Sequence, residues 1–279
     1  MSFGSHEPAA APGPPHDVDV SRPSAARVYD HMLGGKDNFE VDREAARKIL
    51  DVAPEMADVA LENRRWLVRV VQYMIRQGIA QFIDLGSGLP TQDNVHEVAQ
   101  RERPDARVVY VDRDPMVLSH ARALLGSPDL TAYVHADIRD VAGVFESPEV
   151  GRLIDPSRPV GLLAVAVFHF VADEDDPAGL ARRYFERLPG GSMVAISAWP
   201  SDDLSEDLRQ RVRENFTNVP SPLHPRPRAK IAELFDGLKI VEPGLVSVSD
   251  WPTPGQAPPS PVRTFGGVAR VPDTAAVDR

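Results

Sequence analysis

After residue 79 the sequence alternates short apolar segments with helical ones, and this alternation constrains the fold more than any other feature. The segments that fit buried strands, rich in β-branched residues, are 81–85, 107–112, 131–137, 159–167 and 192–199. Several are apolar on both faces, as parallel strands must be when helices cover both sides of the sheet. Helical segments at 92–102, 115–125, 140–154 and 177–188 separate them. The pattern predicts an α/β protein with a doubly wound, mostly parallel sheet.

The two ends of the chain differ from this central region. Residues 1–20 are rich in proline, alanine and glycine and predict a disordered tail, because they cannot bury enough surface to offset their ordering entropy. Residues 21–78 predict an N-terminal helical cap, and residues 79–279 a ligand-binding domain. After residue 200 we expect helices near 203–216 and 228–236, then strands at 238–243 and 262–271. No helix separates these strands, which predicts an antiparallel hairpin at the edge of the sheet.

Composition excludes several classes of function. The chain has 41 acidic and 31 basic residues and a net charge of −10, which disfavours general binding of nucleic acid. It has no cysteine, so disulfides, thiol nucleophiles and thiolate metal sites are excluded, and the histidines show no paired ligand spacing. We therefore predict no metal site. The sequence has no apolar run long enough for a membrane span and no secretory signal, so we expect a cytoplasmic protein.

The first predicted strand runs into a glycine turn at FIDLGSGLPT, residues 82–91. Gly86 and Gly88 would let the backbone pass close to a ligand, beside the free N–H groups of the following helix. A dinucleotide fingerprint would need a glycine where Thr91 stands, and Asp84 would repel a pyrophosphate. A ligand with a cation and no phosphate fits better, and S-adenosylmethionine, which carries an ammonium and a sulfonium, is such a ligand.

Two further strands of the predicted sheet also end in aspartate. Asp112 ends the second strand, where an acid can accept hydrogen bonds from both ribose hydroxyls. Asp137 and Ile138 follow the third strand, where they could take an adenine amino group and cover the ring. We count Ser87 and Arg113, which adjoin these residues, with the same cofactor site. The alternative is that aspartate is simply common at strand ends and caps.

The motifs in residues 82–137 resemble those of class I S-adenosylmethionine-dependent methyltransferases. The sequence is closer still to one bacterial family of such proteins, formerly a domain of unknown function, with hallmarks ARVYDHMLGGKDNFEVDR (26–43), NRRWL (63–67), RVVYVDRDPMVLSHARALL (107–125) and VAVFHFV (165–171). The resemblance implies a seven-stranded sheet with an antiparallel last strand, and S-adenosylmethionine as cofactor. It implies that Asp84, Gly86 and Gly88 hold the methionine end, Asp112 the ribose, and Asp137 with Ile138 the adenine. Pro90 stands where many methyltransferase loops have a third glycine.

Two other regions carry candidate residues for substrate binding and catalysis. Tyr29, Lys36 and Asn38 would belong to a lid over the cofactor and substrate, or else to a helix C-cap followed by an N-cap. His169 could act as a general base, with Phe168 stacking on a ligand, or both could be structural. Methyl transfer often needs little beyond alignment of nucleophile and methyl, so a base is not obligatory.

The most consistent function is a methyltransferase acting on a small-molecule acceptor. Two alternatives remain open, a non-catalytic regulatory protein that binds S-adenosylmethionine or S-adenosylhomocysteine, and an NAD(P)-dependent oxidoreductase. A nucleic-acid methyltransferase is disfavoured by the negative charge. Arg64, Arg65, Arg69 and Arg76 spread around one predicted helix, and we expect a solvated face there rather than a track for RNA.

Overall fold

A computed structural model describes residues 18–90, 93–124, 127–202, 204–207, 210, 221–253, 255 and 263–273, without the side chains of 120–124. Its centre is an eight-stranded sheet in the order β3-β2-β1-β4-β5-β8-β6, with β7 also paired to β8. The strands are β1 (Gln81–Leu85), β2 (Arg107–Asp112), β3 (Thr131–His135), β4 (Gly161–Val165), β5 (Met193–Ala198), β6 (Lys239–Ile240), β7 (Val246–Ser247) and β8 (Phe265–Arg270). Strands β1 to β5 are parallel and β8 is antiparallel, which confirms the predicted sheet class.

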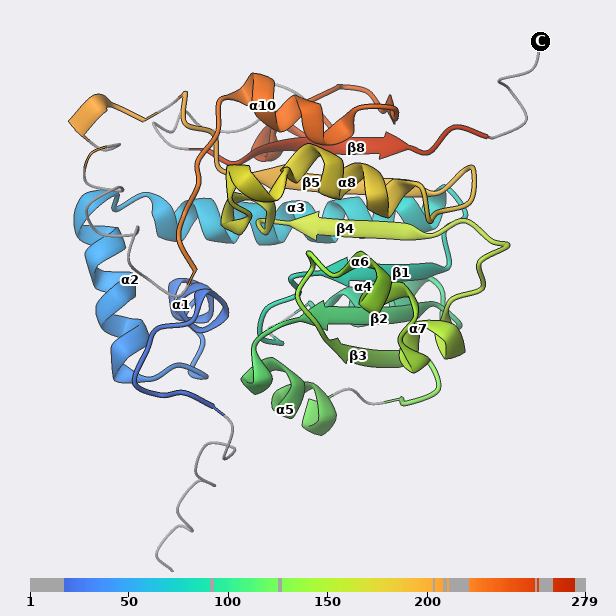
Figure 1. Ribbon diagram of the computed structural model, residues 1–279, viewed down its shortest axis with the longest axis horizontal. Coiled ribbons are helices and arrows are strands. Elements are labelled where there is room, and N and C mark those ends of the chain that lie inside the picture. The colour runs from blue at the N-terminus through green and yellow to red at the C-terminus, as the bar shows by residue number, and fades with distance from the viewer. Residues whose placement is uncertain are drawn as a thin grey trace, which may run out of the picture.

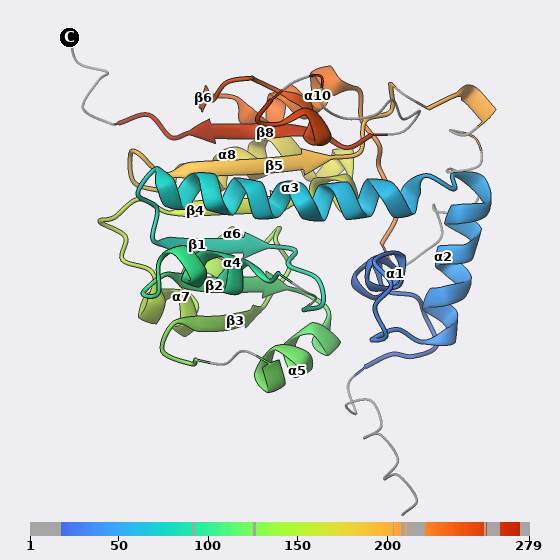
Figure 2. The ribbon, with the colours of Figure 1, turned by 180° about the vertical axis from the view of Figure 1, so that it is seen from behind.

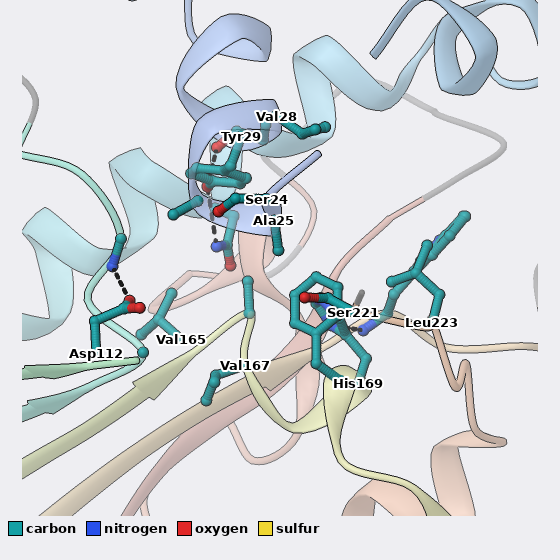
Figure 3. A pocket seen from close by; sticks show the side chains of 18 of the residues that line it. Ser24, Ala25, Val28, Tyr29, Asp112, Val165, Val167, His169, Ser221 and Leu223 are labelled. Carbon is teal, nitrogen blue, oxygen red and sulfur yellow. Dashed lines mark hydrogen bonds between the residues drawn. The ribbon is translucent and has the colours of Figure 1, made fainter. Parts of the chain in front are cut away.

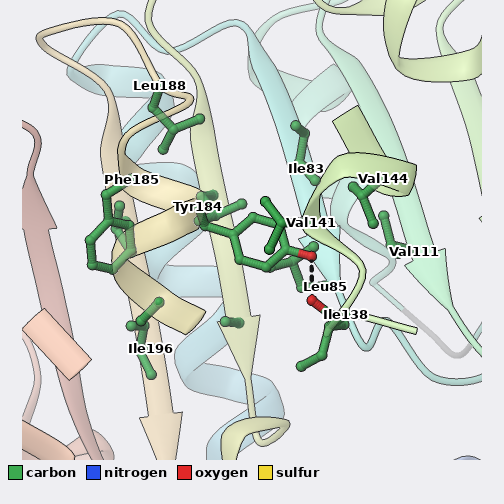
Figure 4. Close-up of a cluster of buried hydrophobic side chains, with 14 of the residues drawn as sticks. Ile83, Leu85, Val111, Ile138, Val141, Val144, Tyr184, Phe185, Leu188 and Ile196 are labelled. Atoms are coloured by element: carbon green, nitrogen blue, oxygen red, sulfur yellow. Dashed lines mark hydrogen bonds between the residues drawn. The ribbon is translucent and has the colours of Figure 1, made fainter. Parts of the chain in front are cut away.

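Helices cover both faces of this sheet (Figures 1 and 2). One face packs against α3 (Met56–Arg76) and α4 (Val95–Glu102). The other packs against α6 (Val141–Phe145), α7 (Pro148–Leu153) and α8 (Pro177–Phe185), while α5 (Pro115–Leu124) flanks β2 and β3. Every residue of β1 is buried, as its position in the middle of a doubly covered sheet requires. In the cluster of Figure 4, the Tyr184 hydroxyl donates to the carbonyl of Ile138 at 2.8 Å, which fixes the chain just after β3.

The number of strands is eight, and the expected seven is wrong because β7 lies outside every predicted strand. The predicted strand 238–243 is shortened to β6, a turn through Pro243 and Gly244 follows, and β7 then pairs with β8 as β6 does. The expected antiparallel pairing at the edge is confirmed, since β6 pairs antiparallel with β8 and these two strands end the sheet, although β7 lies between them in the sequence.

Other differences from the sequence prediction are local. The predicted helix 140–154 is two helices, because the Ser147 hydroxyl accepts from the backbone N–H of Val150 and starts α7 with a proline. The predicted helix 228–236 is α10 (Arg228–Ala232) followed by a 3-10 turn. Most of the predicted helix 203–216 and residues 1–17 of the predicted tail lie outside the described residues. Val18, assigned to that tail, is buried with Leu89, Met116 and Val117 because it is an apolar residue beside an apolar cluster.

The first two helices lie beyond the carboxyl ends of the parallel strands (Figure 1). They are α1 (Ala25–Met32) and α2 (Glu40–Val52), and the buried Asp42 carboxylate ties them together. It accepts from Arg27 Nε at 2.9 Å and from the backbone N–H groups of Ser24 and Phe39 at 3.0 and 2.9 Å. By contrast α3, expected in the same cap, packs along the sheet. The boundary between cap and domain at residue 78 stays a prediction.

Candidate functional site

A cavity of about 280 Å³ opens where the carboxyl ends of the parallel strands face α1, α2 and α3. Figure 3 shows α1 residues such as Tyr29 across the cavity from Val167 and His169, which follow β4. The charged residues of the lining come from α3 and from the strand ends, and they are Arg64, Asp84, Asp112, Arg113, Asp114, Asp137 and Arg139. The lining therefore includes Asp84, Gly86, Ser87, Gly88, Asp112, Arg113, Asp137 and Ile138, all predicted from the sequence as cofactor residues.

The glycine turn after β1 requires its two glycines for different reasons. Gly86 and Gly88 have φ of +65° and +66°, in the left-handed region that L side chains rarely adopt. The N–H of Gly86 donates to the carbonyl of Val111 at 2.8 Å, which holds the turn against β2. A Cβ at Gly86 would come within 2.4 Å of Val167 Cγ2, whereas a Cβ at Gly88 would meet nothing within 4 Å. Gly86 is thus required by close packing, and Gly88 borders open cavity.

Asp112 ends β2 beside this turn and is held by the backbone. Its Oδ2 accepts from the Gly88 N–H at 2.8 Å (Figure 3), and its Oδ1 accepts from the Asp114 N–H at 2.9 Å. A carboxylate has about four lone-pair sites, so the group keeps acceptor capacity for a ligand hydroxyl beside these backbone donors. Burial raises the pKa of Asp112, and the backbone N–H donors act in the opposite direction. Ser87, between the glycines, lies 3.1 Å from the Tyr133 hydroxyl.

Asp84 is the most strongly perturbed carboxyl group of the site. Its side chain is only 4% exposed, and burial raises its pKa to about 7. The positive charge of Arg64 lowers this pKa and the negative charge of Asp112 raises it. Near neutral pH the Asp84 carboxyl group is therefore divided between its neutral and ionised forms, and a ligand cation would favour the ionised one.

The loop after β3 presents an ion pair and an apolar side chain. Asp137 accepts from Arg139 Nη2 at 2.7 Å and from Nε at 3.0 Å, and Arg113 Nη1 lies 3.5 Å away. These hydrogen bonds and charges hold the pKa of Asp137 below its usual value. Ile138 follows with a buried side chain that lines the cavity. A flat apolar group could pack on Ile138, while Asp137 already has charged partners.

His169 lines the cavity, but its environment is a poor one for a base. Burial lowers its pKa to about 3, and the charge of Arg226 acts in the same direction. The Nδ1 atom of His169 accepts from the backbone N–H of Trp199 at 3.4 Å, so the neutral ring carries its proton on Nε2. In this state the other ring nitrogen is a donor. Phe168, predicted to stack on a ligand, is instead buried in the core and does not line the cavity.

The predicted lid residues Tyr29, Lys36 and Asn38 lie in three different environments. Tyr29 lines the cavity, and its hydroxyl donates to the Ala60 carbonyl at 2.9 Å and accepts from Asn63 Nδ2 at 3.3 Å. Lys36 is exposed and lies outside the lining. Asn38 is buried outside it and donates to Asp30 Oδ2 at 2.9 Å and to the Gly35 carbonyl at 3.1 Å. Asn38 therefore has a structural role but caps neither helix, since the C-cap of α1 is Leu33 and the N-cap of α2 is Phe39, and a closing motion stays a prediction.

Sequence reasoning missed many residues of the lining, among them Asn63, Arg64, Trp199 and Leu223. The arginines of α3 were expected to form a solvated face, and this expectation is wrong for Arg64 and Arg69. Arg64 donates to the Asp93 carbonyl at 3.0 Å at the edge of the cavity, and Arg69 donates to the carbonyls of Val248 and Trp251. A signal existed for Arg64, because it stands one helical turn after Ala60 and one before Leu67, both buried.

Two kinds of site are absent from the described part of the chain. No group of three or more histidine, aspartate or glutamate side chains there could hold a metal ion. No helix there is long and apolar enough to cross a membrane.

Comparison with known proteins gives consistent matches. The sequence profile of the S-adenosyl methyltransferase family matches residues 12–272. A DUF574 family protein from Streptomyces avermitilis is 38% identical, with a TM-score of 0.86 over 91% of this chain and 99% of that one. A methyltransferase candidate from Thermobifida fusca is also 38% identical, with a TM-score of 0.85 over 93% and 98% of the two chains.

A more distant structure supports the fold alone. The plantazolicin methyltransferase BpumL, solved with a triazolic substrate analogue and S-adenosylhomocysteine, is 12% identical, with a TM-score of 0.50 over 88% of this chain and 95% of that one. No curated protein matches the sequence.

Proposed function

Since this chain belongs to the S-adenosyl methyltransferase family, and is an S-adenosylmethionine-dependent methyltransferase, we propose that it methylates a small-molecule acceptor within the cavity described above. The observation that carries the proposal is the meeting of Asp84, Asp112 and Ile138 around one glycine turn at the charged end of that cavity. The same cavity continues between α1, α2 and α3, so an acceptor can lie enclosed beside the cofactor.

The residues present fit S-adenosylmethionine by their chemistry. When bound, this cofactor supplies an electrophilic methyl group on a sulfonium sulfur. The buried Asp84 carboxyl group is partly neutral near pH 7. A bound ammonium group would favour its ionised form and pair with it. Asp112, held by backbone N–H groups, would accept from the ribose hydroxyls, and Ile138 would pack against the adenine. The absence of a side chain at Gly88 leaves room for the methionine end.

The rest of the cavity aligns the acceptor. Its walls exclude water and hold the nucleophilic atom in line with the methyl group, which is the main requirement of such a displacement. His169, neutral and with its proton on Nε2, orients the acceptor through a donated hydrogen bond rather than removing a proton. Any proton that the acceptor loses would pass to solvent when the product is released.

Thermal unfolding with single ligands tests the proposed cofactor. A ligand at 100 times its Kd adds about 2.7 kcal/mol to the free energy of unfolding, which raises the midpoint by roughly 5–10 °C for a chain of this size. We expect this rise with S-adenosylmethionine and S-adenosylhomocysteine, and none with NAD or NADP. A rise with NAD or NADP alone would contradict the proposal.

The raised pKa of Asp84 predicts a pH dependence of cofactor binding. Only the ionised carboxylate pairs with the ammonium group, so the affinity for S-adenosylhomocysteine should increase as the pH rises through the pKa of about 7. Between pH 6 and pH 7.5 we expect a gain of about 5-fold, since the ionised fraction rises while the ligand amine begins to lose its proton. Isothermal titration calorimetry measures the affinity at each pH.

The control for this prediction is the Asp84→Asn variant, which has a similar shape and no titrating group. It should bind more weakly than the parent protein at pH 7.5 and show a flat profile over the same range. An unchanged affinity of the parent protein between pH 6 and pH 7.5 would refute the role given to Asp84.

A further inference from the structure

We propose that Arg64 binds the carboxylate of the cofactor's methionine end and that, together with Asp84, it makes the site specific for an intact zwitterionic amino-acid group. This inference rests on the proposed function, which gives the ammonium group to Asp84 and assigns no side chain to the carboxylate. It depends on three features of the site, which are the location of Arg64, the separation of its charge from that of Asp84, and the partners of the other arginines.

Arg64 lies where the cavity meets the glycine turn. It shares this place with Asp84, Ser87 and Gly88, because all four residues line both the main cavity and a smaller one of about 20 Å³ beside the turn. A Cβ at Gly88 would meet nothing within 4 Å, so a ligand can approach the turn closely. A ligand group that reaches this place therefore meets a cationic side chain and an anionic one.

The charges of Arg64 and Asp84 interact but are not in contact. Burial raises the pKa of Asp84 and the positive charge of Arg64 lowers it, yet no ion pair joins these two described residues. The Asp84 carboxylate accepts no hydrogen bond from any described residue, although its side chain is only 4% exposed. Buried charges are normally paired. An amino-acid group carries its ammonium and its carboxylate on one carbon, so it can pair with both side chains at once.

The guanidinium of Arg64 is held in a way that keeps its charge. Its Nη2 donates to the Asp93 carbonyl at 3.0 Å, which ties the side chain to the connection between β1 and α4. A carbonyl carries no net charge, so this contact does not neutralise the guanidinium. The group has five N–H donors in a planar fork that matches the two oxygens of a carboxylate. Arg64 can therefore hold the connection and bind a ligand carboxylate with the same side chain.

The other two arginines of the described lining already lie against a carboxylate. Arg113 Nη1 is 3.5 Å and Arg139 Nη2 is 2.7 Å from Asp137 Oδ2, in the loop after β3. Arg139 Nη1 also donates to Asp175 at 3.0 Å. Both arginines belong to the part of the cavity assigned to the adenine. Arg64 is thus the arginine of the described lining that is placed to bind a carboxylate at the glycine turn.

Two ligands that differ only in the carboxylate test this assignment. They are S-adenosylhomocysteine and its decarboxylated analogue, the adenosine thioether that ends in a 3-aminopropyl group. Isothermal titration calorimetry at pH 7.5 measures the dissociation constant of each with the full-length protein. We expect the parent protein to bind S-adenosylhomocysteine at least about 10-fold more tightly than the analogue, the ratio that a hydrogen bond between charged groups provides.

Replacing Arg64 with methionine keeps a long side chain and removes both the charge and the donors. We expect the preference for S-adenosylhomocysteine to fall below about 3-fold in this variant. The lost charge also raises the pKa of Asp84, but both ligands carry the amine, so this effect leaves their ratio unchanged. A purely structural role of Arg64 in holding the Asp93 connection would weaken both ligands equally and leave the preference intact.

The matched control is Arg65→Met, the same change at the next residue. The Arg65 side chain is 59% exposed and paired with Glu62, and it does not line the cavity. Its replacement should leave both affinities and their ratio unchanged, since exposed ion pairs contribute little to stability.

The outcomes separate this inference from the proposed function. Failure of the parent protein to bind S-adenosylhomocysteine would overturn the proposed function itself. If that ligand binds, a preference below about 10-fold in the parent protein overturns this inference alone, and so does a preference that survives Arg64→Met. If Arg64→Met does not fold, Arg64→Gln takes its place, because glutamine keeps an amide donor and removes the charge. The preference should then fall at least about 3-fold, and an unchanged preference overturns the inference.

Discussion

Replacing Asp112 with alanine is expected to weaken the binding of S-adenosylmethionine at least about 100-fold. A hydrogen bond to a charged group is worth about 1.5–3 kcal/mol, and Asp112 is placed to accept two of them from the ribose. The variant also loses the acceptor for the Gly88 and Asp114 N–H groups, so the glycine turn loses its anchor. Both losses weaken the binding of S-adenosylmethionine, and calorimetric titration with this ligand measures their combined effect on the affinity.

The control for this prediction is Asp105→Ala. Asp105 is a carboxylate that is 73% exposed, paired with Arg103 in the turn before β2, and remote from the cavity lining. Its replacement should change the affinity less than 2-fold, since exposed ion pairs contribute about 0–1 kcal/mol. Binding by Asp112→Ala within about 3-fold of the parent protein would show that Asp112 does not hold the ribose.

Adding a single methyl group at Gly86 and at Gly88 is expected to give two different phenotypes. Both positions have a left-handed backbone, so each alanine variant pays about 1–2 kcal/mol of backbone strain. At Gly86 the new Cβ also lies 2.4 Å from Val167 Cγ2, and that side chain must shift in a packed region. We therefore expect Gly86→Ala to lose about 2–5 kcal/mol of stability in all and much of its cofactor binding.

At Gly88 the new Cβ meets no protein atom within 4 Å and projects into space that the ligand would use. Gly88→Ala should therefore lower stability by the strain alone and yet reduce the affinity for S-adenosylhomocysteine at least about 10-fold. Chemical denaturation and calorimetric titration of both variants separate the two effects. Equal affinity of Gly88→Ala and the parent protein would mean that the cofactor lies elsewhere in the cavity.

The centre of the fold is predictable from the sequence because local and tertiary preferences agree there. The bounds of β1 and β2 match the predicted strands to the residue, since each is a short apolar run that the sheet buries. The edge of the sheet is less predictable. The apolar pattern of 238–243 indicates one strand, but only β6 forms there, and β7 pairs with β8 after the turn at Pro243 and Gly244. Pairing partners at an edge depend on residues far away in the sequence.

The strand-end residues of the site were predictable for a topological reason. Parallel strands place their carboxyl ends along one edge, so Asp84, Asp112 and Asp137 reach the same cavity whatever their separation in sequence. Trp199 follows the end of β5 in the same way and was missed because an apolar residue there indicates core. Lys36 stands in a dense polar motif, yet it is exposed outside the lining, because it lies in the connection between α1 and α2 and not on a helix that faces the cavity.

The position of β8 has a consequence for the order in which the protein is made. β8 supplies the partner for the outer edge of β5, but it follows β5 by the whole segment from 199 to 264. A ribosome that has completed β5 therefore leaves a strand whose side chains are all buried in the native state, with a row of unpaired backbone groups along one side. β8 can pair with that edge along its full length only after residue 270 has been added. Until then the nascent chain depends on its other helices, or on a chaperone, to keep two such chains from pairing with each other.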